Sequence, residues 1–412
     1  MTNLEILIQE LCPDGVEFRT MEEVFEIRNG YTPSKNNPDF WEGGTIPWFR
    51  MEDIRQNGRI LSDAIQHITP AAIKGKGLFP ANSIIIATTA TIGEHALVIA
   101  DSLANQRFTN LAVRKSLSAC LLPKFVFYYM FVIDEWCKKN VNAGNFASVD
   151  MKRFKKLEFP LPPIEVQTEI VRILDKFTSL EAELEAELDC RKRQYEYYRD
   201  KLLSFENVGG QEVEWKKMSE VGTFIRGKRF VRTDIVEEGI PCIHYGDIYT
   251  YYGLTATKAK TYLKPEKAEK MKFASKNDVV IVGAGENNMD IGVGVAWLSD
   301  EKVAIHDACY IFKSKMNPRF VSHYLRGSNY HLQIKKYVCE GKICSISSKS
   351  IGRSLIPVPS LQEQERIATI LDRFESLTTS LQSGLPAEIA ARRQQYEHYR
   401  DKLLTFKRKG AA

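Results

Sequence analysis

The sequence is written twice, and this tandem duplication constrains the fold more than any other feature. The segment V-E-F-R-T-M-E-E-V from Val16 recurs as V-E-W-K-K-M-S-E-V from Val213, an offset of 197 positions (213 − 16). Further on, Q-Y-E-Y-Y-R-D-K-L-L from Gln194 recurs as Q-Y-E-H-Y-R-D-K-L-L from Gln395, with nine of the ten positions identical. An internal repeat of this length predicts two copies of one structural unit.

The two copies have diverged unevenly along their length. Roughly residues 165–205 and 362–406 remain near copies, whereas roughly 25–145 and 222–340 keep only short anchors. Two copies that bind the same partner are expected to keep the same residues, whereas two copies that bind different ligands are expected to diverge. We therefore infer two divergent globular domains and two well-preserved connectors.

The connectors carry the apolar pattern of a left-handed coiled coil. From Ile170 to Phe205 the pattern repeats about every 3.5 residues, the heptad period. It predicts two helices of about 42 residues, each about 60 Å long, packed antiparallel through their apolar seams. The seam residues expected to make these contacts are Ile170, Leu174, Phe177, Tyr195, Tyr198, Leu202, Ile367, Leu371, Phe374, Tyr396, Tyr399 and Leu403.

The second connector differs from the first by an insertion. The offset between the copies grows from 197 to 201 (395 − 194), so four residues enter before Tyr396. Gly384 and Pro386 lie in this stretch. A four-residue insertion locally unwinds a coiled coil, and proline disrupts a helix interior. We expect a kink, or a break followed by a new helix.

Each divergent segment has strand-like apolar runs first and a helix-like run last. The predicted fold class is therefore α+β, with two mixed α/β domains separated by two long antiparallel coiled-coil helices in a pseudo-twofold tandem repeat. The predicted parts are a first domain, a central helical spacer, a second domain and a C-terminal helical spacer, at residues 1–160, 161–206, 207–357 and 358–412.

Composition and charge limit the class of protein without deciding its function. The chain is 44% hydrophobic and 26% charged, which is ordinary for a globular protein, and its net charge of +5 suits a nucleic-acid partner without establishing one. The eight cysteines form no C-x-x-C pair. No leader pattern is visible, and the apolar runs are far shorter than the ~20 residues that span a bilayer. We expect a cytoplasmic protein.

Candidate catalytic motifs fail on inspection. The segment from Gly222 resembles a phosphate-binding loop, but Arg229 stands where a Ser or Thr should bind magnesium. Asn37-Pro-Asp-Phe lacks a proline of the adenine-methyltransferase motif, and Glu340-Gly-Lys lacks an acidic partner for a nuclease site. The seven histidines show no metal-binding spacing. We therefore expect no catalytic residues, no metal site and no cofactor in this chain.

Small, hydroxyl and cationic side chains gather in an early and a late loop of each divergent segment. Such side chains suit contacts with phosphates and base edges. Each alone is more typical of solvated surface, but their recurrence at equivalent places favours a DNA interface. The candidates are Lys35, Arg50, Asn145, Ser148, Lys152 and Arg153 in the first copy, and Lys228, Arg229, Tyr245, Lys342, Ser345 and Lys349 in the second.

The whole pattern resembles specificity subunits of type I restriction–modification enzymes. The likeness rests on L-P-P-I before the first spacer, R-D-K-L-L at the end of both spacers, and the segment from Tyr31 to Trp48, which looks like the opening of a target-recognition domain of that family. The likeness covers essentially the whole chain, with two divergent domains alternating with two near-identical helices.

The resemblance implies a division of labour. Each globular domain would bind one half of a bipartite, asymmetric site on double-stranded DNA, and the helices would set the gap and dock two modification subunits. Those partners would hold S-adenosylmethionine, and restriction subunits that use ATP and Mg²⁺ could join them. Two other readings stay open, namely a scaffold that joins proteins through its helices without touching DNA, and a fused methyltransferase or nuclease.

Overall fold

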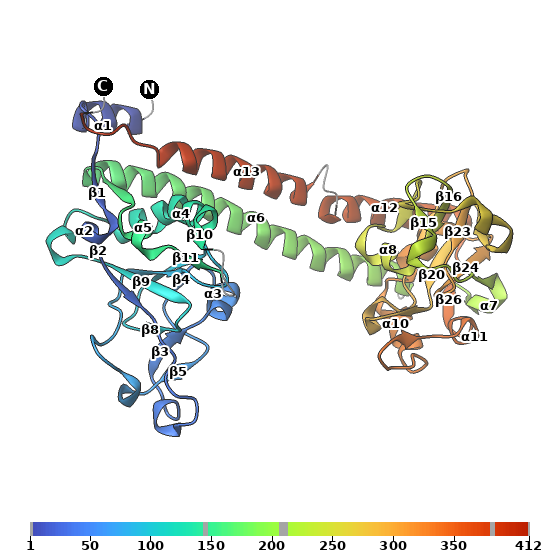
Figure 1. Cartoon of the computed structure of the whole chain (residues 1–412). Coiled ribbons are helices and arrows are strands. Elements are labelled where there is room, and N and C mark those ends of the chain that lie inside the picture. Colours follow the sequence, from blue (N-terminus) through green and yellow to red (C-terminus); the bar gives the residue numbers. More distant parts are fainter. Residues whose placement is uncertain (1–2, 143–146, 206–212, 380–383, 411–412) are drawn as a thin grey trace. The chain divides into compact units, whose positions relative to one another are not determined.

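The computed structural model describes residues 3–142, 147–205, 213–379 and 384–410. The chain divides into two compact units (Figure 1). Unit 1 comprises Met1–Glu183 and Ala390–Ala412, and unit 2 comprises Leu184–Ile389. Each unit therefore combines one divergent segment with parts of both connectors.

Unit 1 is built around a five-stranded sheet in the order β2-β9-β6-β7-β4. Its strands are Phe25–Asn29, Phe108–Val113, Ser83–Ala87, His95–Val98 and Ile60–Leu61. The central strand β6 is buried along its whole length, as its run of three isoleucines requires. Helix α4 (Pro123–Lys139) contacts β6 and β7 and places nine buried side chains in the core.

A second, three-stranded sheet of unit 1 has the order β5-β3-β8, with strands His67–Ile68, Ile46–Phe49 and Leu103–Ala104. A two-stranded ladder joins the start and end of the divergent segment, because β1 (Glu17–Thr20) pairs antiparallel with β12 (Glu158–Leu161). A short helix α1 (Asn3–Leu11) precedes the ladder and buries Leu4.

Unit 2 repeats this plan with other side chains. Its main sheet has the order β14-β24-β20-β22-β17, with strands Gly222–Arg226, Cys309–Ser314, Val279–Val282, Gly294–Trp297 and Thr255–Ala256. The second sheet has the order β15-β18-β16-β23-β19, with strands Ile235–Val236, Thr261–Leu263, Ile240–Ile243, Val303–Ile305 and Phe273–Ala274. Helices α9 (Pro318–Tyr324) and α10 (Ser328–Lys335) follow, and β13 (Trp215–Lys217) pairs with β26 (Leu355–Pro357). The tandem repeat and the strands-then-helix order are confirmed.

The first connector is one helix, α6, from Ile164 to Ser204 (41 residues), as predicted. The second is two helices, α12 (Leu361–Thr379) and α13 (Leu385–Leu403). Between them, Gly384 adopts a φ of +86°, a left-handed conformation that ends helical geometry. The expected break is confirmed.

The predicted seams pack in the same way in the two units. In unit 1, Phe177 of α6 stacks on Tyr399 of α13 at 5.6 Å between ring centroids, and Glu181 pairs with Arg393, so the two helices run antiparallel. In unit 2, Tyr198 of α6 stacks on Phe374 of α12 at 5.5 Å. These stacks are the same pair of repeat positions with the helices exchanged.

The seam residues are fully buried where they meet a globular core and more exposed elsewhere. Ile170 and Leu174 are fully buried in unit 1, while Ile367 and Leu371 are buried in unit 2. The remaining predicted seam residues are partly buried against a core or packed ring on ring, namely Tyr195, Leu202, Tyr396 and Leu403. Leu180 and Leu377, one repeat apart, are 38% and 51% exposed, which leaves apolar helix surface uncovered within each unit.

Candidate nucleic-acid interface

In unit 2, four loops meet at one end of the main sheet, which we term the unit 2 edge. They are residues 227–229 after β14, 244–245 after β16, 283–285 after β20 and 306–308 before β24. Backbone hydrogen bonds tie them together, from Lys228 N to Ile305 O at 2.9 Å and from Ala284 N to Ala308 O at 3.0 Å.

The late loop of unit 2 joins the same edge through a short ladder. Strand β25 (Cys344–Ser345) pairs antiparallel with β21 (Ala284–Gly285), so Ser345 lies opposite Ala284. Tyr249 of α8 (Tyr245–Thr250) lies close to Gly285, where an added Cβ would meet its hydroxyl at 2.7 Å. The early and late loops predicted from the sequence are thus brought together.

Unit 1 builds the same edge from residues 30–32, 50, 88–90 and 105–107, which we term the unit 1 edge. Tyr31 N donates to Ala104 O at 2.9 Å, and Asn105 N donates to Phe49 O at 3.0 Å. Strand β11 (Ser148–Val149) pairs with β10 (Val141–Asn142) and bridges to Thr89, which brings the late loop to this edge.

One glycine in each unit makes this close approach possible. A Cβ on Gly30 would lie 2.3 Å from the carbonyl oxygens of Ala104 and Asn105. A Cβ on Gly227 would lie 2.2 Å from the carbonyl oxygen of His306, far inside van der Waals contact. These two glycines occupy the same position of the repeat (227 − 30 = 197).

The turn before the long strand is also the same in both units. Asn105 Oδ1 accepts from Arg107 N at 3.0 Å, and His306 Nδ1 accepts from Ala308 N at 3.1 Å. The two turns therefore share a backbone path, although one carries an amide and a guanidinium and the other an imidazole and a methyl group. The two edges therefore have the same backbone structure but carry different side chains.

The predicted candidates fall into three groups. Arg50 and Ser148 lie at the unit 1 edge, and Lys228, Arg229, Tyr245 and Ser345 lie at the unit 2 edge. Others are exposed on neighbouring loops and short helices, namely Lys35, Lys152, Arg153, Lys342 and Lys349. Asn145 lies outside the described residues. Contact of any of these residues with DNA stays a prediction.

Sequence reasoning missed four polar side chains that the fold brings to the edges. They are Gln106 and Arg107 in unit 1, and His244 and His306 in unit 2. The turns before β9 and β24 are 201 positions apart (306 − 105), whereas the loops at Gly30 and Gly227 are 197 positions apart. Aligning the strand before each turn, Leu103–Ala104 and Val303–Ile305, would have found these turns.

The unit 2 edge contains a cluster of aromatic and imidazole rings. The ring of His244 lies 4.3 Å from that of Tyr245 and 4.6 Å from that of His306 between centroids, and Phe230 lies 4.8 Å from His306. Burial lowers the pKa of both His244 and His306, and for His306 the neighbouring His244 lowers it further. Both imidazoles are therefore neutral near pH 7.

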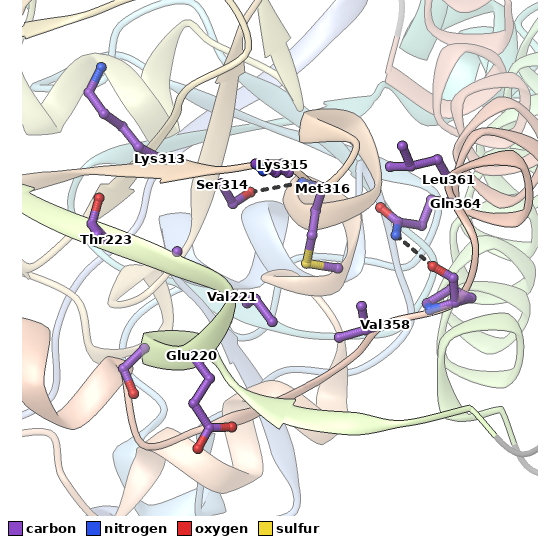
Figure 2. Close-up of a pocket in the computed structure, with 13 residues that line it drawn as sticks. Glu220, Val221, Thr223, Lys313, Ser314, Lys315, Met316, Val358, Leu361 and Gln364 are labelled. Atoms are coloured by element: carbon purple, nitrogen blue, oxygen red, sulfur yellow. Dashed lines mark hydrogen bonds between the residues drawn. The ribbon is translucent and has the colours of Figure 1, made fainter.

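A large groove, of about 760 Å³, lies at the opposite end of the unit 2 sheet (Figure 2). Figure 2 shows Val221, Met316 and Val358 around it. Beside it, three residues connect β24 to α9, whereas nine residues, 114–122, connect β9 to α4 in unit 1. In unit 1 that longer connection buries Leu117 and Leu121 in the core. Since its lining includes the start of β14 and the end of β24, the groove lies away from the unit 2 edge.

Across residues 3–142, 147–205, 213–379 and 384–410, no cluster of three or more His, Cys, Asp or Glu side chains is placed to bind a metal ion. Within the same described part of the chain, no helix is both long enough and apolar enough to cross a membrane.

Comparison with known proteins places the chain in a family. The family model described as the type I restriction modification DNA specificity domain matches residues 13–189 and again 211–391. The chain belongs to this family. The specificity subunit of the type I restriction enzyme EcoprrI from Escherichia coli is 39% identical over 392 residues, which is 92% of each chain. The EcoR124I/EcoR124II specificity subunit, also from Escherichia coli, is 36% identical over 69% of this chain and 71% of that protein.

Solved structures support the fold. A chain from a structure that describes complex assembly and conformational transition of the type I R-M system matches with a TM-score of 0.65 at 16% identity, over 95% of this chain and 97% of that one. The HsdS subunit from Thermoanaerobacter tengcongensis matches with a TM-score of 0.51 at 16% identity, over 96% and 97%. Both matches extend over nearly the whole chain, so they support the fold along its full length.

Proposed function

We propose that this specificity subunit reads a two-part, asymmetric DNA target, with unit 1 reading one part and unit 2 the other. One observation carries the proposal, namely that the same edge is built twice from the same backbone contacts but carries different side chains. Two readers of identical sequence would read two identical half-sites, whereas two readers that differ at equivalent positions read two different ones.

The differences between the edges are of the kind that changes base preference. Arg50 in unit 1 stands where His244 stands in unit 2, and Asn105 stands where His306 stands. Guanidinium, amide and imidazole groups present different sets of donors and acceptors, so they favour different base edges. Exposed cations beside the edges, such as Lys228 and Arg229, would contact phosphates and hold the register.

The helices have the two further roles expected of a connector. A 41-residue helix is about 60 Å long and stiff, so it suits a ruler for the unread bases between the two parts of the target. Its exposed apolar side chains, among them Leu180 and Tyr197, suit docking of partner proteins. The proposed partners are two DNA-methyltransferase (modification) subunits, with ATP-dependent restriction subunits joining the complex.

The chain itself would act as a non-catalytic, cytoplasmic DNA-binding subunit. In this proposal S-adenosylmethionine is bound by the modification subunits, and ATP and Mg²⁺ by the restriction subunits, and no cofactor is assigned to this chain. The support is the absence of a complete nucleotide-binding or nuclease motif in the sequence.

The test is a genome-wide map of methylated adenines in cells that carry the cognate modification subunit, with and without this chain. A two-part motif with a fixed gap that appears only with the chain supports the proposal. An unchanged methylation pattern, together with DNA binding by the assembled complex that does not weaken with salt, would instead indicate a protein scaffold, because phosphate contacts are strongly salt-dependent.

A further inference from the structure

One position is built identically in the two edges yet holds a different polar residue in each. Arg50 and His244 each follow the strand at the centre of the second sheet and each cap a short helix, α3 (Met51–Asn57) or α8. The main-chain N–H of Arg50 donates to Asp53 Oδ2 at 2.7 Å, and that of His244 donates to Asp247 Oδ2 at 3.2 Å. The same carboxylate clamp therefore fixes the backbone of both residues.

The side chain of Arg50 is held in place but its guanidinium is incompletely satisfied. Its guanidinium carbon lies 5.9 Å from the ring centre of Trp48, and its Nε lies 3.9 Å from Glu52 Oε2, too far for a hydrogen bond. Among the described residues, this buried Nε has no hydrogen-bond partner. A buried donor without a partner is costly, so this placement of the guanidinium does not serve stability.

The side chain of His244 is held in one tautomer. Its Nδ1 accepts a hydrogen bond from Gly246 N at 3.2 Å, so the neutral ring carries its proton on Nε2. Tyr245 and His306 flank the ring at 4.3 and 4.6 Å between centroids and restrict its rotation. The ring therefore offers one oriented donor, Nε2–H.

We propose that Arg50 and His244 are the specificity-determining residues of the two edges, and that each donates hydrogen bonds to a purine in the major groove. Arg50 has the planar fork that fits guanine O6 and N7 together, whereas His244 has a single donor that fits one purine acceptor. The inference rests on the proposed function, since it names the residues by which the two parts of the target are read.

The charge around His244 supports a neutral donor rather than a cation. Asp247 and Asp307 favour the charged form of His244, whereas His244 and Arg229 both lower the pKa of the neighbouring His306. Burial outweighs the two carboxylates and lowers the pKa of His244. The imidazole thus contributes a hydrogen bond near pH 7, and a base contact that depends on geometry rather than charge discriminates between bases.

The experiment uses the full chain assembled with its modification subunits in cells, and reads the methylated motif genome-wide. The variants are Arg50→Lys, which keeps the charge but loses the fork, and His244→Asn. The controls are Arg55→Lys on helix α3 and His67→Asn on strand β5, both outside the two edges. Co-purification of each variant with the modification subunit shows that the complex is intact.

We expect Arg50→Lys to relax one base position in one half of the motif, and His244→Asn to relax one position in the other half. Methylation at the original sites should fall about 10- to 100-fold, the effect of one lost base contact. Both controls should leave the motif unchanged.

Three results would overturn the inference. An unchanged motif in both variants would show that neither residue reads a base. A uniform loss at all sites by an intact complex would assign them to phosphate binding. If the unaltered chain directs no two-part motif, the proposed function fails first and this inference fails with it.

Discussion

One aspartate in each unit links a connector helix to a helix of the globular part, and its removal gives a measurable prediction. In unit 2, Asp372 of α12 accepts from His323 Nε2 at 2.8 Å and pairs with Arg319, both on α9. The His323 side chain is fully buried, whereas Arg319 is a quarter exposed and also pairs with Glu365. The substitution Asp372→Ala would therefore cost mainly the bond to His323.

A hydrogen bond to a charged group contributes about 1.5–3 kcal/mol, and its loss leaves a buried donor without a partner. We expect the free energy of local opening of α9 to fall by about 2–3 kcal/mol in Asp372→Ala, which corresponds to amide exchange about 30- to 150-fold faster. Hydrogen–deuterium exchange of peptides from α9 measures this directly.

The repeat supplies a matched counterpart. In unit 1, Asp175 accepts from Tyr128 Oη at 2.7 Å and pairs with Lys124 at 2.6 Å, and the side chains of Lys124 and Asp175 are 46% and 36% exposed. The exposed pair contributes little, but Tyr128 is buried as His323 is, so Asp175→Ala should also lower the free energy of opening of α4 by about 2–3 kcal/mol. Lys124→Ala removes only the exposed pair and should lower it by less than about 1 kcal/mol. Equal effects of Asp175→Ala and Lys124→Ala, or unchanged exchange in α9 after Asp372→Ala, would refute the argument from burial.

Three further predictions concern the edges and unit 2. The substitution Gly227→Ala, whose Cβ would meet the His306 carbonyl oxygen at 2.2 Å, should distort the unit 2 edge and abolish recognition of one half of the motif, as methylation mapping would show. Arg229→Gln should weaken DNA binding alike for all sequences and reduce the slope of log affinity against log salt by about 1, measured by titration at several salt concentrations. Burial lowers the pKa of four histidines in the folded unit 2, namely His244, His306, His323 and His331. In the unfolded chain these histidines take up protons at their ordinary pKa of about 6.5, so the unfolded state binds more protons than the folded state below about pH 7. The stability of unit 2 should therefore fall as pH falls from about 7 to 5, as measured by hydrogen exchange corrected for its intrinsic pH dependence.

The fold could largely be predicted from the sequence because its signals are periodic and occur twice. The heptad pattern defined α6 to within a few residues, and the inserted Gly384 marked the break between α12 and α13. The four-part division at 1–160, 161–206, 207–357 and 358–412 stays a prediction. Strand order could not be predicted, because short apolar runs such as Ser83–Ala87 do not reveal their neighbours.

The candidate interface was predicted less completely, for a physical reason. The sequence predicted the loops that contain a glycine or a run of cationic residues. Each edge, however, also includes loops that follow or precede strands far apart in the sequence. The turn at Asn105 joins the unit 1 edge because β8 pairs with β3 and β9 pairs with both β2 and β6. Long-range pairing of this kind leaves no local pattern, so Gln106, Arg107, His244 and His306 were missed.

The two aspartates also suggest how the domains could diverge without losing their helices. Asp175 and Asp372 occupy the same repeat position (372 − 175 = 197), but their partners have changed from tyrosine and lysine to histidine and arginine. A carboxylate accepts hydrogen bonds from any of these four groups. The connector helix can thus keep its aspartate while the side chains of α4 and α9 that bind it change with the rest of each domain. An exchange of recognition domains between relatives should therefore keep the helix carboxylate and carry α4 or α9 with the sheet.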